Sequence, residues 1–198
     1  MSGFERAIAF TTLLLILLLP AAAGAADPVN RLVDHPSPYL ALHGSDPVAW
    51  QEWNADTLAR AKRENKLLFV SVGYFACHWC HVMQRESYKN AQIAALLNRD
   101  FIPVKVDREL NSGLDDALQT FSARLNGVAG WPLNAFVTPE GYPAFGVLYA
   151  PPDDFRKLLT HLSGRWAADP AGIRRLARQA APPPALRPTS APLTATRT

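Results

Sequence analysis

The chain has 198 residues, of which 48% are hydrophobic and 19% are charged. This length suits one compact domain with some extra sequence at its ends, and the composition excludes a chain that is disordered throughout. The net charge of +3 arises from arginines near the C-terminus, and the body is close to neutral. Nucleic-acid binding calls for lysine and arginine gathered on one folded face, so we expect no nucleic-acid partner.

Residues 1–26 have the pattern of a secretory signal peptide. Arg6 precedes an apolar run from Ala7 to Leu19, and small residues ending at Ala26 provide a cleavage site. The apolar run is shorter than the roughly 20 residues that a helix needs to span a bilayer, and a retained anchor is the alternative interpretation. We expect a periplasmic or secreted protein in an oxidising compartment, without membrane contact after signal cleavage.

Three further segments follow the signal peptide. Prolines interrupt any long periodic pattern in residues 27–53, which we interpret as an irregular N-terminal arm packed on the domain. The domain itself is expected over residues 54–180. Residues 181–198 are rich in Pro, Ala and Thr and have few large apolar side chains, so they are expected to form a disordered tail.

Helices and strands are expected to alternate within the domain. Asn54 is placed to cap a helix over 55–65, which leads into a buried strand of apolar residues over 67–72. Turn residues at 139–143 make the last two strands antiparallel neighbours. The other expected elements are helix 77–87, a helix capped by Asn90 and ending at 97, strand 101–106, helix 114–125, strands 133–138 and 144–149, and helix 153–162.

Both cysteines of the chain lie in the motif Cys77-His78-Trp79-Cys80. Unpaired backbone N–H groups at a helix start stabilise a thiolate and can lower its pKa from about 8.5 to roughly 3.5–7.5. Cys77 is therefore the expected attacking sulfur, and Cys80, one turn further, the thiol that resolves a mixed disulfide. We expect His78 to tune the thiolate and Trp79 to offer an apolar surface to a substrate, with simple packing as the other interpretation of Trp79.

Two other chemistries fit the same residues. The run from Cys77 to His81 matches C-x-x-C-H, the attachment pattern of c-type haem, although alternating strands and helices are unlike the small helical cytochromes. Cys77, Cys80 and His81 share one helical face and offer two thiolates and an imidazole to a soft metal, without an obvious fourth ligand. Our expectation is no cofactor and no metal.

A longer set of residues carries a family resemblance. Besides Phe69–Met83, this set contains Asn30–Leu32, Ser37–Leu40, Asp46–Trp50, Val104–Glu109 and Gly130–Leu133. It resembles the thioredoxin-like domain of the spermatogenesis-associated, thioredoxin-domain-containing protein family, over roughly residues 30–155. The resemblance implies an α/β, thioredoxin-like fold with a central mixed β-sheet flanked by helices.

The resemblance also implies roles for residues outside the cysteine motif. A cis-proline ahead of a strand faces the CxxC helix in this fold, and Pro132 matches that position, so the Trp131 backbone would pair with a substrate strand. Thioredoxin carries an acidic residue six positions before its first cysteine, where this chain has Ser71. Larger family members also carry a glycosidase-like helical barrel behind this domain, and nothing of that barrel's role is carried over.

The motif and the resemblance together predict a thiol–disulfide oxidoreductase. Its expected partners are protein thiol or disulfide substrates and a redox partner that restores the Cys77–Cys80 pair. The alternative is a non-catalytic binding module, which would keep the fold and hold a protein partner or a soft metal.

Overall fold

The computed structural model describes residues 29–181 and 186–188. The expected signal peptide at 1–26 lies outside the described residues, as does most of the tail expected at 181–198. Among the helices in these ranges, none has the length and apolar character needed to cross a membrane.

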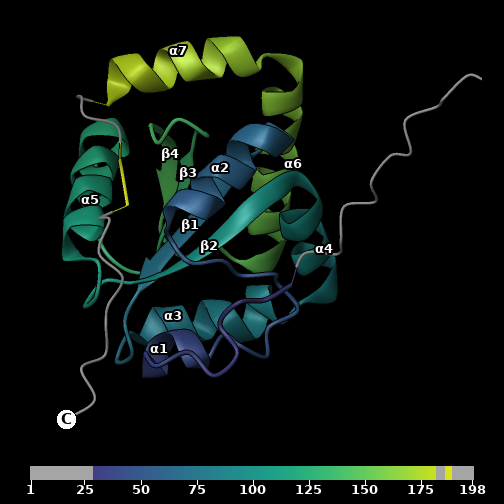
Figure 1. Cartoon of the computed structure of the whole chain (residues 1–198), viewed down its shortest axis with the longest axis vertical. Coiled ribbons are helices and arrows are strands. Elements are labelled where there is room, and N and C mark those ends of the chain that lie inside the picture. Colours follow the sequence, from purple (N-terminus) through teal and green to yellow (C-terminus); the bar gives the residue numbers. More distant parts are fainter. Residues whose placement is uncertain (1–28, 182–185, 189–198) are drawn as a thin grey trace, which may run out of the picture.

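A mixed four-stranded sheet forms the centre of the molecule (Figure 1). Its strands follow the spatial order β2-β1-β3-β4 and comprise β1 (Leu67–Gly73), β2 (Phe101–Asp107), β3 (Leu133–Val137) and β4 (Pro143–Val147). Strands β1 and β2 are parallel, whereas β3 runs antiparallel to both β1 and β4. A parallel β-α-β unit that continues into an antiparallel hairpin is the thioredoxin-like arrangement, and the predicted fold class is confirmed.

Helices cover both faces of this sheet because alternate strand residues point to opposite sides. One face packs against α2 (Ala55–Glu64) and α5 (Ser112–Asn126). The other face packs against α1 (Pro38–Ala41), α3 (His78–Met83), α4 (Ala91–Asp100) and α6 (Pro152–Ala168). A π-helical turn, η1 (Gln84–Tyr88), continues α3. In Figure 1, α1 and α3 lie together at the end of the molecule opposite α7 (Pro170–Ala180).

The segment before α2 is more regular than the irregular arm expected from its prolines. Pro38 opens the short helix α1, and the Ser37 hydroxyl caps it by accepting the Leu40 N–H at 3.2 Å. Gln51 pairs in parallel with Val104 on the outer side of β2. Three side chains of this segment, Leu32, Tyr39 and Trp50, are almost completely buried, so the segment supplies part of the core.

The C-terminal part differs from the sequence expectation in the extent of its helices. Helix α6 continues to Ala168 where its end was expected at 162, and the unexpected helix α7 follows. Asp169 starts α7 by accepting the Gly172 N–H at 2.7 Å, with Pro170 as the first helical residue. In the tail segment, the Leu186 N–H donates to the Gly141 carbonyl at 2.8 Å, which holds this residue beside the β3–β4 turn.

Candidate functional site

Cys77 stands at the start of α3, as the motif predicts. It is the N-cap residue, and its Sγ accepts the backbone N–H of Cys80 at 3.2 Å. The two cysteines form a disulfide with Cα atoms 5.3 Å apart. Cys77 is 4% exposed and Cys80 is 1% exposed. Both cysteines are therefore buried, and Cys77, which caps the helix, is the slightly more exposed residue of the pair.

Exposed aromatic side chains surround the motif. Phe75 is 54% exposed and Trp79 is 51% exposed. The Trp79 ring packs on Tyr149 with centroids 4.9 Å apart, and the exposed His78 ring meets the Trp79 ring edge-on at 5.6 Å. The structure thus places His78 and Trp79 together on the outer surface of α3.

The His81 side chain contacts a backbone carbonyl of the preceding loop and does not join the cysteines in a metal site. Its Nε2 lies 2.7 Å from the Phe75 carbonyl oxygen, and its ring meets the Phe75 ring edge-on at 6.4 Å. This contact ties α3 to the loop that precedes it. Within the part of the chain that the structure describes, no group of three or more His, Cys, Asp or Glu residues is arranged to hold a metal ion.

The loop ahead of β3 carries the cis-proline that the resemblance implies. The Trp131–Pro132 peptide bond is cis, so this expectation is confirmed. Trp131 meets Tyr74 edge-on with centroids 5.7 Å apart, and the Tyr74 carbonyl accepts the Cys77 N–H at 3.2 Å. The Arg108 guanidinium lies 4.1 Å from the Trp131 ring centroid and also packs against this ring. Tyr74 therefore links the Trp131–Pro132 loop to the cysteine motif.

Gly73, the last residue of β1, lies directly beneath Cys80. A Cβ atom added at Gly73 would collide with the Tyr39 hydroxyl and would stand 2.6 Å from the Cys80 Sγ. Only glycine leaves room for both groups at this point. The hydroxyl of Tyr39, which comes from α1, thus lies next to the Cys80 sulfur of the disulfide.

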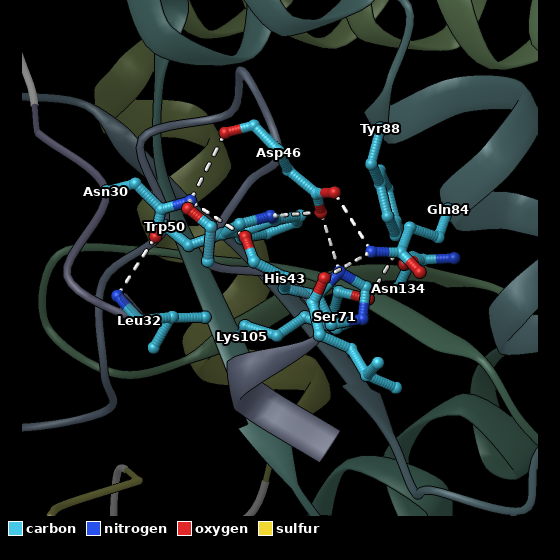
Figure 2. A network of polar contacts seen from close by, with 12 residues as sticks. Asn30, Leu32, His43, Asp46, Trp50, Ser71, Gln84, Tyr88, Lys105 and Asn134 are labelled. Carbon is cyan, nitrogen blue, oxygen red and sulfur yellow. Dashed lines mark hydrogen bonds and ion pairs between the residues drawn. The ribbon is translucent and has the colours of Figure 1, made fainter. Parts of the chain in front are cut away.

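A row of buried polar side chains crosses the sheet at Ser71, two residues before Gly73 on β1. Lys105, Ser71 and Asn134 are direct neighbours on β2, β1 and β3. The Lys105 Nζ donates to the Ser71 Oγ at 2.8 Å, and the Tyr88 hydroxyl joins Ser71 to Asn134 through contacts of 2.9 and 2.8 Å (Figure 2). At the position of the thioredoxin carboxylate, this chain has a hydroxyl paired with a lysine.

Lys105 is the most unusual member of this row. It is 1% exposed, and no carboxylate among the described residues forms an ion pair with it. Its Nζ lies over the rings of Tyr39, Trp50 and Tyr88 at 5.2, 5.4 and 4.9 Å from their centroids. These rings attract a cation. Burial nevertheless lowers the pKa of Lys105 to about 7, against an opposing effect of Asp46.

A second buried network joins the N-terminal segment to η1 (Figure 2). The Asp46 carboxylate accepts hydrogen bonds from His43 Nδ1 at 2.7 Å, Trp50 Nε1 at 3.0 Å and Gln84 Nε2 at 3.0 Å. Burial, followed by the charge of Lys105, lowers the pKa of His43 to about 4. Burial acts to raise the pKa of Asp46, but the hydrogen bond from His43 and the other donors hold it below its ordinary value. The network keeps this segment in contact with the helix that carries the cysteines.

Comparison with known protein families identifies the family of this chain. The model of the family Thioredox_DsbH, described as "Protein of unknown function, DUF255", matches residues 29–182. The chain belongs to this family.

Relatives of this Thioredox_DsbH member confirm the resemblance stated from the sequence. Spermatogenesis-associated protein 20 of Mus musculus is 43% identical over 144 residues, which are 70% of this chain and 18% of the relative. Uncharacterized protein B0495.5 of Caenorhabditis elegans is 44% identical over 130 residues, 66% of this chain and 18% of the relative. The chain therefore spans about a fifth of the length of these relatives. A solved structure named DsbH Oxidoreductase is 17% identical, with a TM-score of 0.47 over 59% of this chain and 85% of that one.

In this Thioredox_DsbH member, sequence reasoning missed part of the surroundings of the cysteines. The sequence singled out Tyr39 and Lys105 only as members of the runs that carry the resemblance. The fold places Tyr39 next to the disulfide and Lys105 beside Ser71. One signal was present, since Lys105 interrupts the apolar run Phe101–Val106, whose other residues suit burial on both faces.

Proposed function

We propose that this protein is a thiol–disulfide oxidoreductase. In the reducing direction, the Cys77 thiolate attacks a substrate disulfide, forms a mixed disulfide and releases the first substrate thiolate. The Cys80 thiolate then attacks the Cys77 sulfur, the Cys77–substrate bond breaks, and the second substrate thiolate leaves. Two electrons pass to the substrate, and the two thiol protons end on its thiols. The oxidising direction is the reverse sequence.

The hydrogen bond from the Cys80 N–H to the Cys77 Sγ is the observation that carries this proposal. Placed at the N-cap of α3, the Cys77 sulfur receives the partial positive charge of the first helical turn, which favours its thiolate. A thiolate is both the attacking group and the better leaving group in exchange. Cys80 is the less exposed residue of the pair, which suits the resolving role, because it then has to reach only the Cys77 sulfur of a mixed disulfide.

The neighbouring residues have proposed roles in the same reaction. The exposed His78 adds a hydrogen-bonding or positive group near the motif, and Trp79 provides an apolar contact for a substrate chain. The Trp131 backbone, ahead of Pro132, pairs with an extended substrate segment. The substrates are protein thiols or disulfides, and a separate redox partner restores the pair.

We also propose that the protein is exported from the cytoplasm. The pattern of residues 1–26 supports a periplasmic or secreted location, in which the mature protein is free of the membrane. An oxidising compartment would supply both disulfide substrates and an oxidant for the Cys77–Cys80 thiols.

A non-catalytic binding module is the second candidate, and the burial of the sulfurs favours it. With Cys77 only 4% exposed, an approaching substrate disulfide has limited access. The exposed rings of Phe75 and Trp79 would then serve to bind a partner, while the disulfide stays closed.

Trapping with single-cysteine variants separates the two candidates. We expect reduced Cys80→Ala to accumulate mixed disulfides at Cys77 when mixed with a disulfide-containing peptide, because the resolving thiol is missing. Cys77→Ala should accumulate few, since Cys80 lies beneath the surface. Intact mass spectrometry measures both, with the Cys77→Ala/Cys80→Ala variant as the blank. Equal trapping at both positions would contradict the assigned order, and no trapping at either would favour the binding module.

A further inference from the structure

Tyr39 is a buried polar group near the dithiol that the exchange reaction above does not use. Its side chain is 1% exposed, and its hydroxyl has no hydrogen-bond partner within the described ranges 29–181 and 186–188. A buried hydroxyl without a partner is unfavourable, because it has lost its hydrogen bonds to water. A group of this kind calls for a partner in another state of the protein.

The Cys80 sulfur is the group placed to become that partner. The Tyr39 hydroxyl and the Cys80 Sγ both lie close to the position that a Cβ atom of Gly73 would occupy, so the two groups are neighbours at the end of β1. In the disulfide, the Cys80 sulfur is bonded to Cys77 and is a weak acceptor. When the disulfide opens, the same sulfur can become a thiolate, and hydrogen bonds to an ionised acceptor are roughly twice as strong as neutral ones.

The surrounding contacts hold Tyr39 in this position. Ser37 caps the helix that carries Tyr39, and its hydroxyl also donates to the Asp107 carboxylate at 2.7 Å. Lys105 lies against the Tyr39 ring, with Nζ 5.2 Å from the centroid. Contacts with Asp107 and Lys105 of β2 therefore hold α1 and its tyrosine against the sheet.

The charges around Tyr39 keep it a donor. Burial, followed by the effects of Tyr88, Asp107 and Asp46, raises the pKa of Tyr39 well above its ordinary value. Two further titratable groups contact the Tyr39 ring: the Lys105 amine lies over it, and the His43 ring meets it edge-on with centroids 5.3 Å apart. The phenol consequently keeps its proton at neutral pH, and its hydroxyl can donate to a thiolate without being ionised itself.

We propose that Tyr39 is a catalytic residue of the dithiol, whose hydroxyl donates a hydrogen bond to the Cys80 sulfur when that sulfur is a thiolate. The proposal rests on the function proposed above. In the resolving step, Cys80 gives its proton to a water or buffer base, and its thiolate attacks the Cys77 sulfur as the Cys77–substrate bond breaks. The leaving substrate thiolate takes up a proton from solvent, and Tyr39 keeps its own proton throughout.

The test is a pH titration of the Cys80 thiol in the Cys77→Ser variant, with and without Tyr39→Phe. The NMR chemical shift of the Cys80 Cβ carbon reports the ionisation of the thiol. Tyr39→Phe keeps the ring and removes a hydroxyl that is unpartnered in the disulfide form, so we expect the fold to be retained. The acid dissociation constant of Cys80 should fall about tenfold in Tyr39→Phe, because losing a hydrogen bond to the thiolate favours the protonated thiol; a tenfold change corresponds to about 1.4 kcal/mol.

Tyr88→Phe in the same background is the matched control. It also removes a buried tyrosine hydroxyl, but one that contacts Ser71 and Asn134. It should change the Cys80 constant by less than about twofold, well below the tenfold step that 1.4 kcal/mol represents. An unchanged constant in Tyr39→Phe, or an equal shift in Tyr88→Phe, would overturn the proposal.

This titration is independent of exchange activity because the tested protein has one thiol. If wild-type protein showed no reversible disulfide while Tyr39→Phe shifted the Cys80 constant, the proposed function would fail and the hydrogen bond would stand. If the wild-type disulfide were reversible while Tyr39→Phe left the Cys80 constant unchanged, the proposed function would stand and the hydrogen bond would fail.

Discussion

Gly73→Ala is expected to destabilise the protein by about 3 kcal/mol, because overpacking a filled core costs typically 1–3 kcal/mol and occasionally more. The added methyl would meet the Tyr39 hydroxyl and the Cys80 sulfur, and neither neighbour can move away freely. One is part of a disulfide, and the other belongs to a buried side chain. Urea denaturation of the oxidised protein measures the loss.

Gly164→Ala is the matched control for this substitution. Gly164 is exposed within α6, and a Cβ added there meets nothing within 4 Å. Alanine at such a site should stabilise the protein by about 0.5–1 kcal/mol. The Tyr39→Phe/Gly73→Ala pair should recover part of the loss, since it removes the hydroxyl that the methyl meets. A Gly73→Ala protein as stable as wild type would show that Tyr39 and Cys80 do not meet above β1.

Lys105→Met is expected to stabilise the protein at neutral pH and to remove a large part of its pH dependence. The pKa of Lys105 is about 7 in the folded protein, whereas an unfolded lysine keeps its proton up to about pH 10.4. Between these values the unfolded state binds more protons, so wild-type stability should rise with pH. A tenfold difference between the folded and unfolded acid dissociation constants corresponds to about 1.4 kcal/mol, which makes the full effect a few kcal/mol.

Urea denaturation at pH 6.5, 8 and 9.5, with the disulfide closed, measures this effect. Wild-type stability should increase over the series, and that of Lys105→Met should stay nearly constant. Lys157→Met is the control, because Lys157 is on the surface with its side chain 72% exposed, and its slope should equal that of wild type. A Lys105→Met slope as steep as the wild-type slope would mean that Lys105 titrates normally in the folded protein.

The sequence predicted the elements whose signals are local. The apolar runs at 67–72 and 101–106 became the buried parallel strands β1 and β2. Asn54 and Asn90 cap their helices by accepting backbone N–H groups, as expected from their residue types. Such signals involve residues close in sequence, so they can be interpreted without knowing the fold.

The groups behind the cysteines could not be derived in this way. Lys105 contacts Ser71 only because β1 and β2 pair in one register, and Tyr39 reaches Cys80 only because the N-terminal segment folds back over the sheet. These contacts span more than thirty positions of the chain and depend on tertiary packing. Helix α7 is a different case, because Asp169-Pro170 is a recognisable helix start that the composition of the following tail obscured.

Equilibration of the mature protein across a series of glutathione ratios tests the central claim most directly. Thiols are trapped at each ratio and counted by intact mass. The account predicts that Cys77 and Cys80 gain and lose their thiols together in one reversible transition, whose midpoint shows whether the protein tends to oxidise or reduce its partners. Thiols that never pair, or a disulfide that no ratio opens, would contradict the oxidoreductase function.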